Sequence, residues 1–595
     1  AGTDDGLIHI TVDGGLHWKD VTPPQLTPWM KVSIMDAGHF DALTAYAAIN
    51  TLRIDDLRPH ILRTHDGGKT WSEIVSGIPA GTTVNAVRED PKRKGLLFAG
   101  TEQAVFVSFD DGDHWQSLRL NMAPSSVRDI VIKNDDLLAG THGRGFWILD
   151  DITPLRQLDA KIAAADAVLF KPQVAYRVRW NTNTDTPLPP DEPAGQNPPD
   201  GAIINYALKL ASSGPVTLEI LDAAGKLVRR YSSADPVPPV DPQLAIPAYW
   251  LRPPQVLSSG AGMHRFLWDM HYPPATGARA NYPIAAVAHN TAPAATSPWV
   301  MPGQYTVRLT ADGKSYTQPL TVKMDPRVKT PLAGLQQQFT LSKQLCDDAE
   351  AAAKAIEEIR IVRAQLQKVK EGTGAGAQPD AITVLDKKLA DLVGTAGGGF
   401  GGGGAAQAAD TLNSVRGSLQ SLMGILQGAD VAPTTQAVAA ITARRKAMAA
   451  LLARWREIKT KEVPAVTGAP AANAGAADGQ LKYALACRHT EPNNEAFEFV
   501  VTNPNRTDYR GQANSSKTFD ISVFPESGAT DQPVWQWSRG KMFAQMITPV
   551  TIAAGKNWEA QASASLKPGN YKAVAVFLPS GGTAQCSFDV QPARQ

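Results

Sequence analysis

The first 150 residues alternate apolar and polar positions in short runs, which is the pattern of half-buried β-strands. Turn-forming residues follow each run. One set of strands is expected at residues 32–34, 45–49, 61–63 and 71–75, a second at 84–88, 96–100 and 105–108, and a third at 127–132, 137–140 and 146–149. This recurrence predicts a row of small antiparallel sheets, with about 45 residues in each repeat.

A short motif of the form hydroxyl-x-Asp-x-Gly-x-x-Trp marks three of these repeats, and its aspartates are 53 and 44 residues apart. The aspartate can accept backbone N–H groups in a tight turn, and the glycine allows the positive φ that closes it. The tryptophan is expected to fold onto its hairpin and the next strand. The motif residues are Thr11, Asp13, Gly15 and Trp18; Thr64, Asp66, Gly68 and Trp71; and Ser108, Asp110, Gly112 and Trp115.

These Asp boxes, together with residues 138–150 and Pro154-Leu155-Arg156-Gln157, resemble bacterial Asp-box (BNR-repeat) proteins related to the sortilin propeller. Many such proteins are labelled glycosyl hydrolases. The resemblance implies a partial β-propeller of three to four blades over residues 1–158. Rings of this kind usually need at least four blades. We therefore expect further blades, either from a preceding segment of the same chain or from a partner chain.

The box aspartates invite comparison with the paired carboxylates of glycosidases. Because they recur at one local position in each repeat, we assign them to holding turns. Other loop carboxylates, at Asp36, Asp41, Asp55 and Asp56, are the candidates for a glycosidase pair but share no distinguishing motif. The sequence thus assigns no catalytic residue, and a glycoside hydrolase with its site largely in other blades remains the alternative.

The middle of the chain contains one β region and one helical region. Residues 159–214 are rich in proline, asparagine and aspartate and predict an extended connector. Residues 215–325, with Trp268-Asp269 and Pro302-Gly303-Gln304-Tyr305, resemble the Ig-like domain of flagellar hook-capping proteins, interrupted by insertions. Helical periodicity over residues 331–460 then predicts a bundle or hairpin.

Two segments that interrupt or follow these helices are expected to be linkers. A glycine-rich linker is expected at 394–405, since the run lacks the Gly-Lys-Ser/Thr ending of a phosphate loop. Residues 461–480, rich in alanine, glycine and proline, form the second predicted linker.

Residues 481–595 return to strands and predict a second β-sandwich. They resemble the BsuPI family of intracellular proteinase inhibitors, a resemblance that implies inhibition of a serine protease. It rests on Thr502-Asn503, Phe519-Asp520, Val534-Trp535-Gln536-Trp537-Ser538, Gly540-Lys541-Met542-Phe543, Gly555, and Pro568-Gly569 with Tyr571. Trp535, Trp537 and Phe543 are expected to be packing anchors rather than a binding platform.

Charge and composition exclude several classes of function. The chain has 58 basic and 57 acidic side chains, a net charge of +1, so it lacks the basic surface of a nucleic-acid-binding protein. It has no apolar run long enough to span a membrane, and we expect no cofactor. Metal binding by His264, Asp269 and His271 is disfavoured, because residues 264 and 269 of one strand would face opposite sides.

The three cysteines are too few for a disulfide scaffold. Cys487 and Cys586 lie near the two ends of one module and form a disulfide in an oxidising compartment, or else stay as two buried thiols. Cys346 lies in a helical pattern and is expected to be packed. The chain opens within a repeat and without methionine, so we expect an upstream segment that carries an export signal.

Three functions fit this organisation. The first is an exported multidomain binding or scaffold protein that recognises a protein, peptide or glycan through its propeller. The second is the glycoside hydrolase, and the third is a proteinase inhibitor or regulator that acts through residues 481–595.

Overall fold

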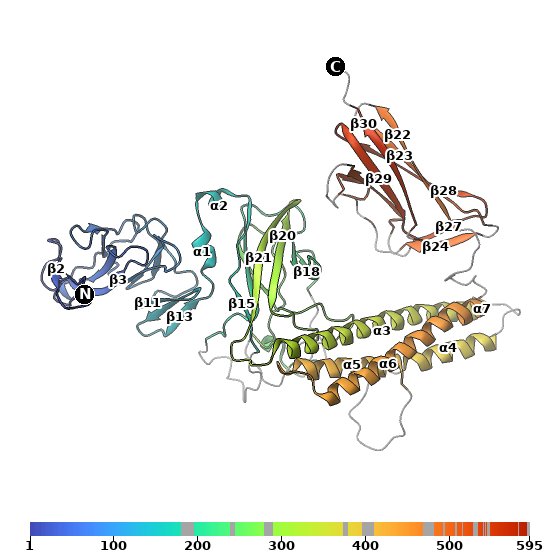
Figure 1. Cartoon of the computed structure of the whole chain (residues 1–595), viewed down its shortest axis with the longest axis horizontal. Coiled ribbons are helices and arrows are strands. Elements are labelled where there is room, and N and C mark those ends of the chain that lie inside the picture. The colour runs from blue at the N-terminus through green and yellow to red at the C-terminus, as the bar shows by residue number, and fades with distance from the viewer. Residues whose placement is uncertain are drawn as a thin grey trace. The chain divides into compact units, whose positions relative to one another are not determined.

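The computed structural model divides the chain into two compact units, residues 1–467 and 468–595. It is mainly β, as the sequence predicts, with one group of long helices (Figure 1). The structure describes residues 1–179, 195–237, 244, 246–278, 282, 289–294, 296–372, 379–394, 410–467, 481–491, 494–505, 508–513, 516–526, 533–539, 541, 543, 548–580 and 582–591.

The first unit begins with a row of four antiparallel sheets, the partial β-propeller predicted from the repeats. We number the blades in chain order: the first described blade is a strand pair, the second and third have four strands, and the fourth has three. Their strands are β1 (His9–Ile10) and β2 (Lys19–Asp20); β3 (Lys31–Ala37), β4 (Ala45–Asn50), β5 (His60–Thr64) and β6 (Ser72–Glu73); β7 (Val84–Glu89), β8 (Leu97–Thr101), β9 (Val105–Ser108) and β10 (Gln116–Ser117); and β11 (Val127–Lys133), β12 (Asp136–Thr141) and β13 (Phe146–Leu149).

Apolar residues from neighbouring blades interlock between the sheets. Ala48 and Ile61 of the second blade pack with Val87, Ala99 and Phe106 of the third. Further apolar clusters fill the spaces between the first and second blades and between the third and fourth blades. Strands β8 and β9 of the third blade therefore bury both faces along their whole length, which explains why they are mostly apolar.

A short helix follows the fourth blade and docks onto the third. This helix, α1 (Thr153–Gln157), presents Arg156, whose Nε donates to the buried Asp90 carboxylate at 2.8 Å. The Arg156 guanidinium also pairs with Asp135. The Pro154–Gln157 motif thus ties the end of the blade row to its third member.

The predicted connector at 159–214 is wrong in part, because three strands of a sandwich lie within it. These are β14 (Ala167–Leu169), β15 (Ala175–Arg177) and β16 (Ala202–Leu208), and a short helix, α2 (Ala160–Ala164), precedes them. β14 and β15 are too short for alternation to show, and β16 is buried on both faces and mostly apolar, with Asn205 among its buried residues. The proline-rich stretch 187–193 lies outside the described residues.

The sandwich therefore begins well before residue 215. One sheet has the order β14-β16-β19 and the other β15-β21-β20-β17-β18, with β15 parallel to β21. Trp268 is fully buried in the core between them. The remaining elements are β17 (Thr217–Leu221), β18 (Leu227–Ser232), the 3-10 turn η2 (Ala248–Trp250), β19 (Gly262–Trp268), β20 (Gly303–Ala311) and β21 (Lys314–Met324).

Long helices complete the first unit, and α3, α5 and α6 run against one another (Figure 1). Buried leucines, isoleucines and alanines from all of them form one core. The helices are α3 (Leu332–Gly372), α4 (Pro379–Val393), α5 (Leu412–Gln427), α6 (Thr435–Glu457), the π-helix η3 (Ile458–Glu462) and α7 (Val463–Thr467). The predicted linker at 461–480 is therefore helical up to Thr467, and the rest of it lies outside the described residues, as does nearly all of 394–405.

The second unit contains three antiparallel sheets around one apolar core. Their orders are β22-β23-β28, β24-β27 and β26-β25-β29-β30. The strands are β22 (Lys482–Glu491), β23 (Asn494–Thr502), β24 (Tyr509–Ala513), β25 (Phe519–Pro525), β26 (Trp535–Gln536), β27 (Thr548–Ile552), β28 (Asn557–Ser565), β29 (Gly569–Phe577) and β30 (Gly582–Val590).

Candidate functional site

Each Asp box closes its own turn through the same hydrogen bonds. In the second blade, Asp66 Oδ1 accepts the Thr70 backbone N–H at 2.9 Å, and Thr64 Oγ1 accepts the Gly68 N–H at 3.0 Å. Gly68 has φ +82°, which a residue with a Cβ rarely adopts. Asp13 and Asp110 make the equivalent bonds to His17 and His114, both at 2.9 Å. The three carboxylates are occupied locally and do not meet.

Two of the three box tryptophans, Trp71 and Trp115, bind the preceding blade rather than the next strand of their own blade, whereas Trp18 is 52% exposed. Trp71 Nε1 donates to the Val21 carbonyl at 2.9 Å, and Trp115 Nε1 donates to the Ile74 carbonyl at 2.8 Å. The box glycines lie over the same two residues, so a Cβ at Gly68 would come within 2.7 Å of Val21. The box therefore connects neighbouring blades as well as closing its own turn, and the sequence motif alone did not indicate this contact.

The hydrogen bonds of the box make blade stability depend on pH. The Thr70 backbone N–H, followed by the Thr70 hydroxyl, lowers the pKa of Asp66 to about 2 from an ordinary 3.8. Since the pKa is lower in the folded state, the stabilisation is present above pH 3.8 and is lost as the pH falls toward 2. We expect Asp66→Asn to flatten the fall in thermal midpoint over that range.

Thermal unfolding of the full chain between pH 5 and pH 2 measures this effect, with Asp4→Asn on an exposed residue of the first blade as the control. An unchanged pH profile for Asp66→Asn would contradict the assignment.

A cleft of about 550 Å³ lies between the second and third blades. It is lined by Asp41, His65, Lys94, Gly95, Phe109, Asp110 and Asp111. Its charged groups come from loops at one end of the two sheets and from the third Asp box. The cleft therefore forms only because the two blades are packed together.

Asp111 is the centre of a hydrogen-bond network in this cleft. Its carboxylate accepts the Tyr46 hydroxyl at 2.5 Å and binds His65 Nε2 at 2.8 Å. Arg63 Nη1 donates to the Asp111 carbonyl at 2.6 Å, and His65 Nδ1 lies 2.9 Å from Thr44 Oγ1. These bonds hold the carboxylate and the imidazole in fixed positions.

Electrostatics in and around the cleft follow from burial and hydrogen bonding. Burial raises the pKa of Tyr46, and the bond to Asp111 raises it further, so this phenol stays protonated and donates. Backbone N–H of Leu43, then the Thr44 hydroxyl, lowers the pKa of Asp41. The cleft thus presents the ionised Asp41 carboxylate, with Lys94 in the same lining.

The structure does not assemble the four glycosidase candidates into a pair. Asp41 alone among them lines this cleft, whereas Asp56 lines a second pocket with Arg58, His60 and Glu73. Asp36 lies in strand β3 rather than in a loop, and its Oδ2 accepts the Glu89 N–H at 2.7 Å. Asp55 caps the 3-10 turn η1 (Leu52–Ile54). The carboxylates that do meet, Asp41, Asp110 and Asp111, were not grouped by any motif.

His264 and His271 serve structural contacts. His264 Nε2 lies 2.8 Å from the Gly260 carbonyl, and His271 Nδ1 lies 2.7 Å from the Asp269 carbonyl. Across the described residues, no group of three or more potential ligands is placed to hold a metal ion. Among the helices that the structure describes, none has an apolar stretch of membrane-spanning length.

The Trp535–Ser538 segment of the second unit is held by one buried carboxylate. Asp520 accepts Gln536 Nε2 and Ser538 Oγ, each at 2.7 Å, and pairs with Lys517. Burial opposes ionisation of Asp520, but these bonds outweigh it and keep its pKa below the ordinary value. Trp537 packs on Phe519, with 4.1 Å between ring centroids. The Trp535–Ser538 segment of the motif therefore serves packing and hydrogen bonding within the domain.

A scan against protein families matches residues 484–581 to "BsuPI: Intracellular proteinase inhibitor". The C-terminal unit carries a BsuPI domain. This confirms the resemblance drawn from the sequence. No curated protein matches the chain.

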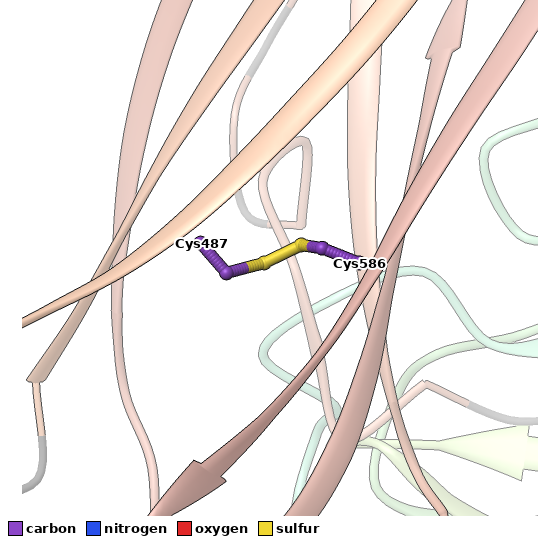
Figure 2. Close-up of a disulfide and its surroundings, with 2 residues drawn as sticks. All are labelled: Cys487 and Cys586. Atoms are coloured by element: carbon purple, nitrogen blue, oxygen red, sulfur yellow. A yellow bond between two sulfur atoms is a disulfide. The ribbon is translucent and has the colours of Figure 1, made fainter.

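A disulfide links the first and last strands of the C-terminal unit. Cys487 of β22 and Cys586 of β30 are bonded, with 6.3 Å between their Cα atoms (Figure 2). Cys487 lies within the matched region and Cys586 lies beyond it. Because β22 and β30 belong to different sheets, the bond links the two sheets directly. Cys346 is a buried free thiol.

Several solved structures match parts of the chain. "YCF48 bound to D1 peptide" is 14% identical with a TM-score of 0.21, and the match covers 39% of this chain and 64% of that one. A GH74 xyloglucanase from Xanthomonas campestris has 14% identity and a TM-score of 0.21, with coverage of 55% and 68%. PorZ from Porphyromonas gingivalis has 14% identity and a TM-score of 0.18, with coverage of 52% and 40%. At these TM-scores, the propeller assignment rests on the sheets themselves.

Proposed function

We propose that this chain is an exported multidomain binding protein that recognises a protein, peptide or glycan through its propeller. The observation that carries the proposal is the use of the box carboxylates. All three hold their own turns, while the cleft between the second and third blades gathers side chains from both blades in a fixed network. Such preorganised polar groups in a concave site suit ligand recognition.

The chemistry of the cleft indicates what it would bind. Three carboxylates, Asp41, Asp110 and Asp111, outnumber the single lysine, Lys94, and Phe109 adds an apolar wall. Because a carboxylate can accept several hydrogen bonds at once, a ligand that offers a basic group or several hydroxyls can bind these groups in addition to their present partners. An arginine or lysine side chain of a peptide has the first property, and a sugar has the second.

The experiment uses the full chain with two probes, a lysine- and arginine-containing peptide library and xyloglucan oligosaccharides. We expect saturable binding of one probe class, weakened about tenfold or more by Asp41→Asn through loss of a charge-assisted contact. Asp113→Asn is the matched control, since Asp113 pairs with Arg63 but does not line the cleft. We also expect no release of reducing sugar. Sugar release that Asp41→Asn abolishes would show a hydrolase instead.

A second function, proteinase inhibition, is favoured by the match of residues 484–581 to the BsuPI family. The carrying motif is engaged in core contacts, so an inhibitory segment would lie elsewhere in the domain. Titrating the full chain against serine proteases tests this function separately from the cleft.

Export is supported by the Cys487–Cys586 bond, since disulfides persist in oxidising compartments.

A further inference from the structure

The outer edge of the fourth blade has no partner strand in the described chain. In the first three blades a short last strand, β2, β6 or β10, pairs with the strand before the box. The fourth blade ends its order at β13. Phe146 and Ile148 on this strand are 85% and 54% exposed. An apolar edge strand thus lies open, a feature that folded proteins usually cover.

The three last strands share one sequence pattern, Trp-polar-polar-aliphatic. They read Trp18-Lys19-Asp20-Val21, Trp71-Ser72-Glu73-Ile74 and Trp115-Gln116-Ser117-Leu118. The aliphatic residue closes each strand in the same way, because its N–H donates to the carbonyl of Ile8, Ile61 or Val105 at 2.8–2.9 Å. The last strand of a blade in this chain is therefore defined by three examples, each with the same sequence pattern and the same closing hydrogen bond.

Strand register identifies where a fourth copy would bind. Val105 lies opposite Gly100 in the third blade, and Phe146 lies opposite Gly140 in the fourth. Phe146 is thus the counterpart of Val105, and Ile148 is the counterpart of Val107, which pairs with Gln116. Since main-chain groups alternate along a strand, those of Phe146 and Ile148 face the open edge.

The third blade offers a second hydrogen-bond acceptor, the Leu118 carbonyl. Trp71 and Trp115 each donate to the carbonyl of the aliphatic residue that ends the preceding blade, Val21 and Ile74. Leu118 is the same residue of the third blade, and its N–H makes the equivalent bond to Val105 at 2.8 Å. Within the described residues, no donor reaches the Leu118 carbonyl. Trp147, the nearby tryptophan of β13, donates to the Arg144 carbonyl instead.

We propose that the β13 edge and the Leu118 carbonyl form a strand-addition site for an extended segment of a partner polypeptide with the pattern Trp-x-x-aliphatic. Its main chain would pair with Phe146 and Ile148, and its indole would donate to Leu118, continuing the interface that the other blades already make. This inference rests on the proposed function, because it names a polypeptide as one ligand of the propeller.

The test measures binding of a fluorescent peptide with the sequence of residues 108–118 to the full chain by anisotropy. We expect saturable binding, weakened roughly tenfold when alanine replaces the peptide's tryptophan or when the chain carries Ile148→Pro, each of which removes a hydrogen bond. Proline is tolerated on an edge strand, where its missing N–H would face outward. Ile148→Ala keeps the N–H and is the matched control, expected to weaken binding less than about threefold.

Hydrogen exchange gives a second readout that does not depend on the variants. The amides of β13 are expected to exchange more slowly once the peptide is added. Absence of saturable binding to the unmodified chain, or equal weakening by Ile148→Pro and Ile148→Ala, would overturn strand addition. The peptide contains no lysine or arginine, so its binding does not report on the cleft, and failure at this edge is distinguishable from failure of the cleft.

Discussion

Replacing both Cys487 and Cys586 by serine is expected to lower the free energy of unfolding of the C-terminal unit by about 3–5 kcal/mol. The bond spans 99 residues, nearly the whole unit, so reducing it releases a long loop in the unfolded state. It also joins the edge strands of two sheets that otherwise meet through apolar contacts. Denaturant unfolding of the full chain, followed by hydrogen exchange of residues 482–590, measures the loss.

Reduction provides the matched comparison. The chain has three cysteines, of which only Cys346 is free in the structure. A thiol reagent should therefore find one thiol in the denatured, unreduced chain and three after reduction. Reductant should destabilise the C-terminal unit of Cys346→Ala as much as that of the unmodified chain. Three thiols before reduction would contradict both the disulfide and the proposal of export.

Asp430→Ala is expected to destabilise the first unit by about 3–5 kcal/mol, because it leaves a buried arginine without its negatively charged partner. Asp430 pairs with Arg177 of β15 and with Arg179, and the Arg177 and Asp430 side chains are only 2% and 4% exposed. Burial lowers the pKa of Arg177, and the Asp430 carboxylate opposes that shift. Without Asp430, the Arg177 guanidinium keeps its bond to the Val300 carbonyl at 2.9 Å and its contact with the face of Trp299, and neither group carries a negative charge.

A double-mutant cycle in urea checks this prediction. Arg177→Met combined with Asp430→Leu should recover most of the loss, since an apolar pair of similar volume needs no desolvation of charge. Asp347→Ala breaks the exposed pair with Lys343 on α3 and should cost less than about 1 kcal/mol. Equal effects of Asp430→Ala and Asp347→Ala would show that the buried cluster is not what joins the sandwich to the helices.

Local patterns predicted the repeats well because their physics is local. Alternation located most strands of the blades, and the hydroxyl, aspartate and glycine of each box lie within one turn, where the hydrogen bonds form. The same holds for the long helices and for the BsuPI motif. Prediction failed at β14, β15 and β16, where composition rich in proline concealed short or fully buried strands.

The candidate site was only partly predictable. Sequence reasoning singled out Asp41 and Asp110 for separate reasons. No motif in the amino-acid sequence associates these two residues with the other charged residues of the cleft, His65, Lys94 and Asp111. Blade 2 and blade 3 contribute these residues from positions up to 70 apart, and only sheet packing brings them to one cleft. The docking of Trp71 and Trp115 on the preceding blade was likewise missed.

The amino-acid sequence by itself determined the blade repeats, the turn chemistry of the boxes, the helical segments and the BsuPI domain, because each depends on residues close together in the chain. Tertiary structure alone decided which carboxylates share the cleft, which carbonyl each tryptophan reaches, and where an edge such as β13 is left open. Those outcomes depend on how separate sheets pack, and packing between distant segments leaves no periodic trace in the sequence.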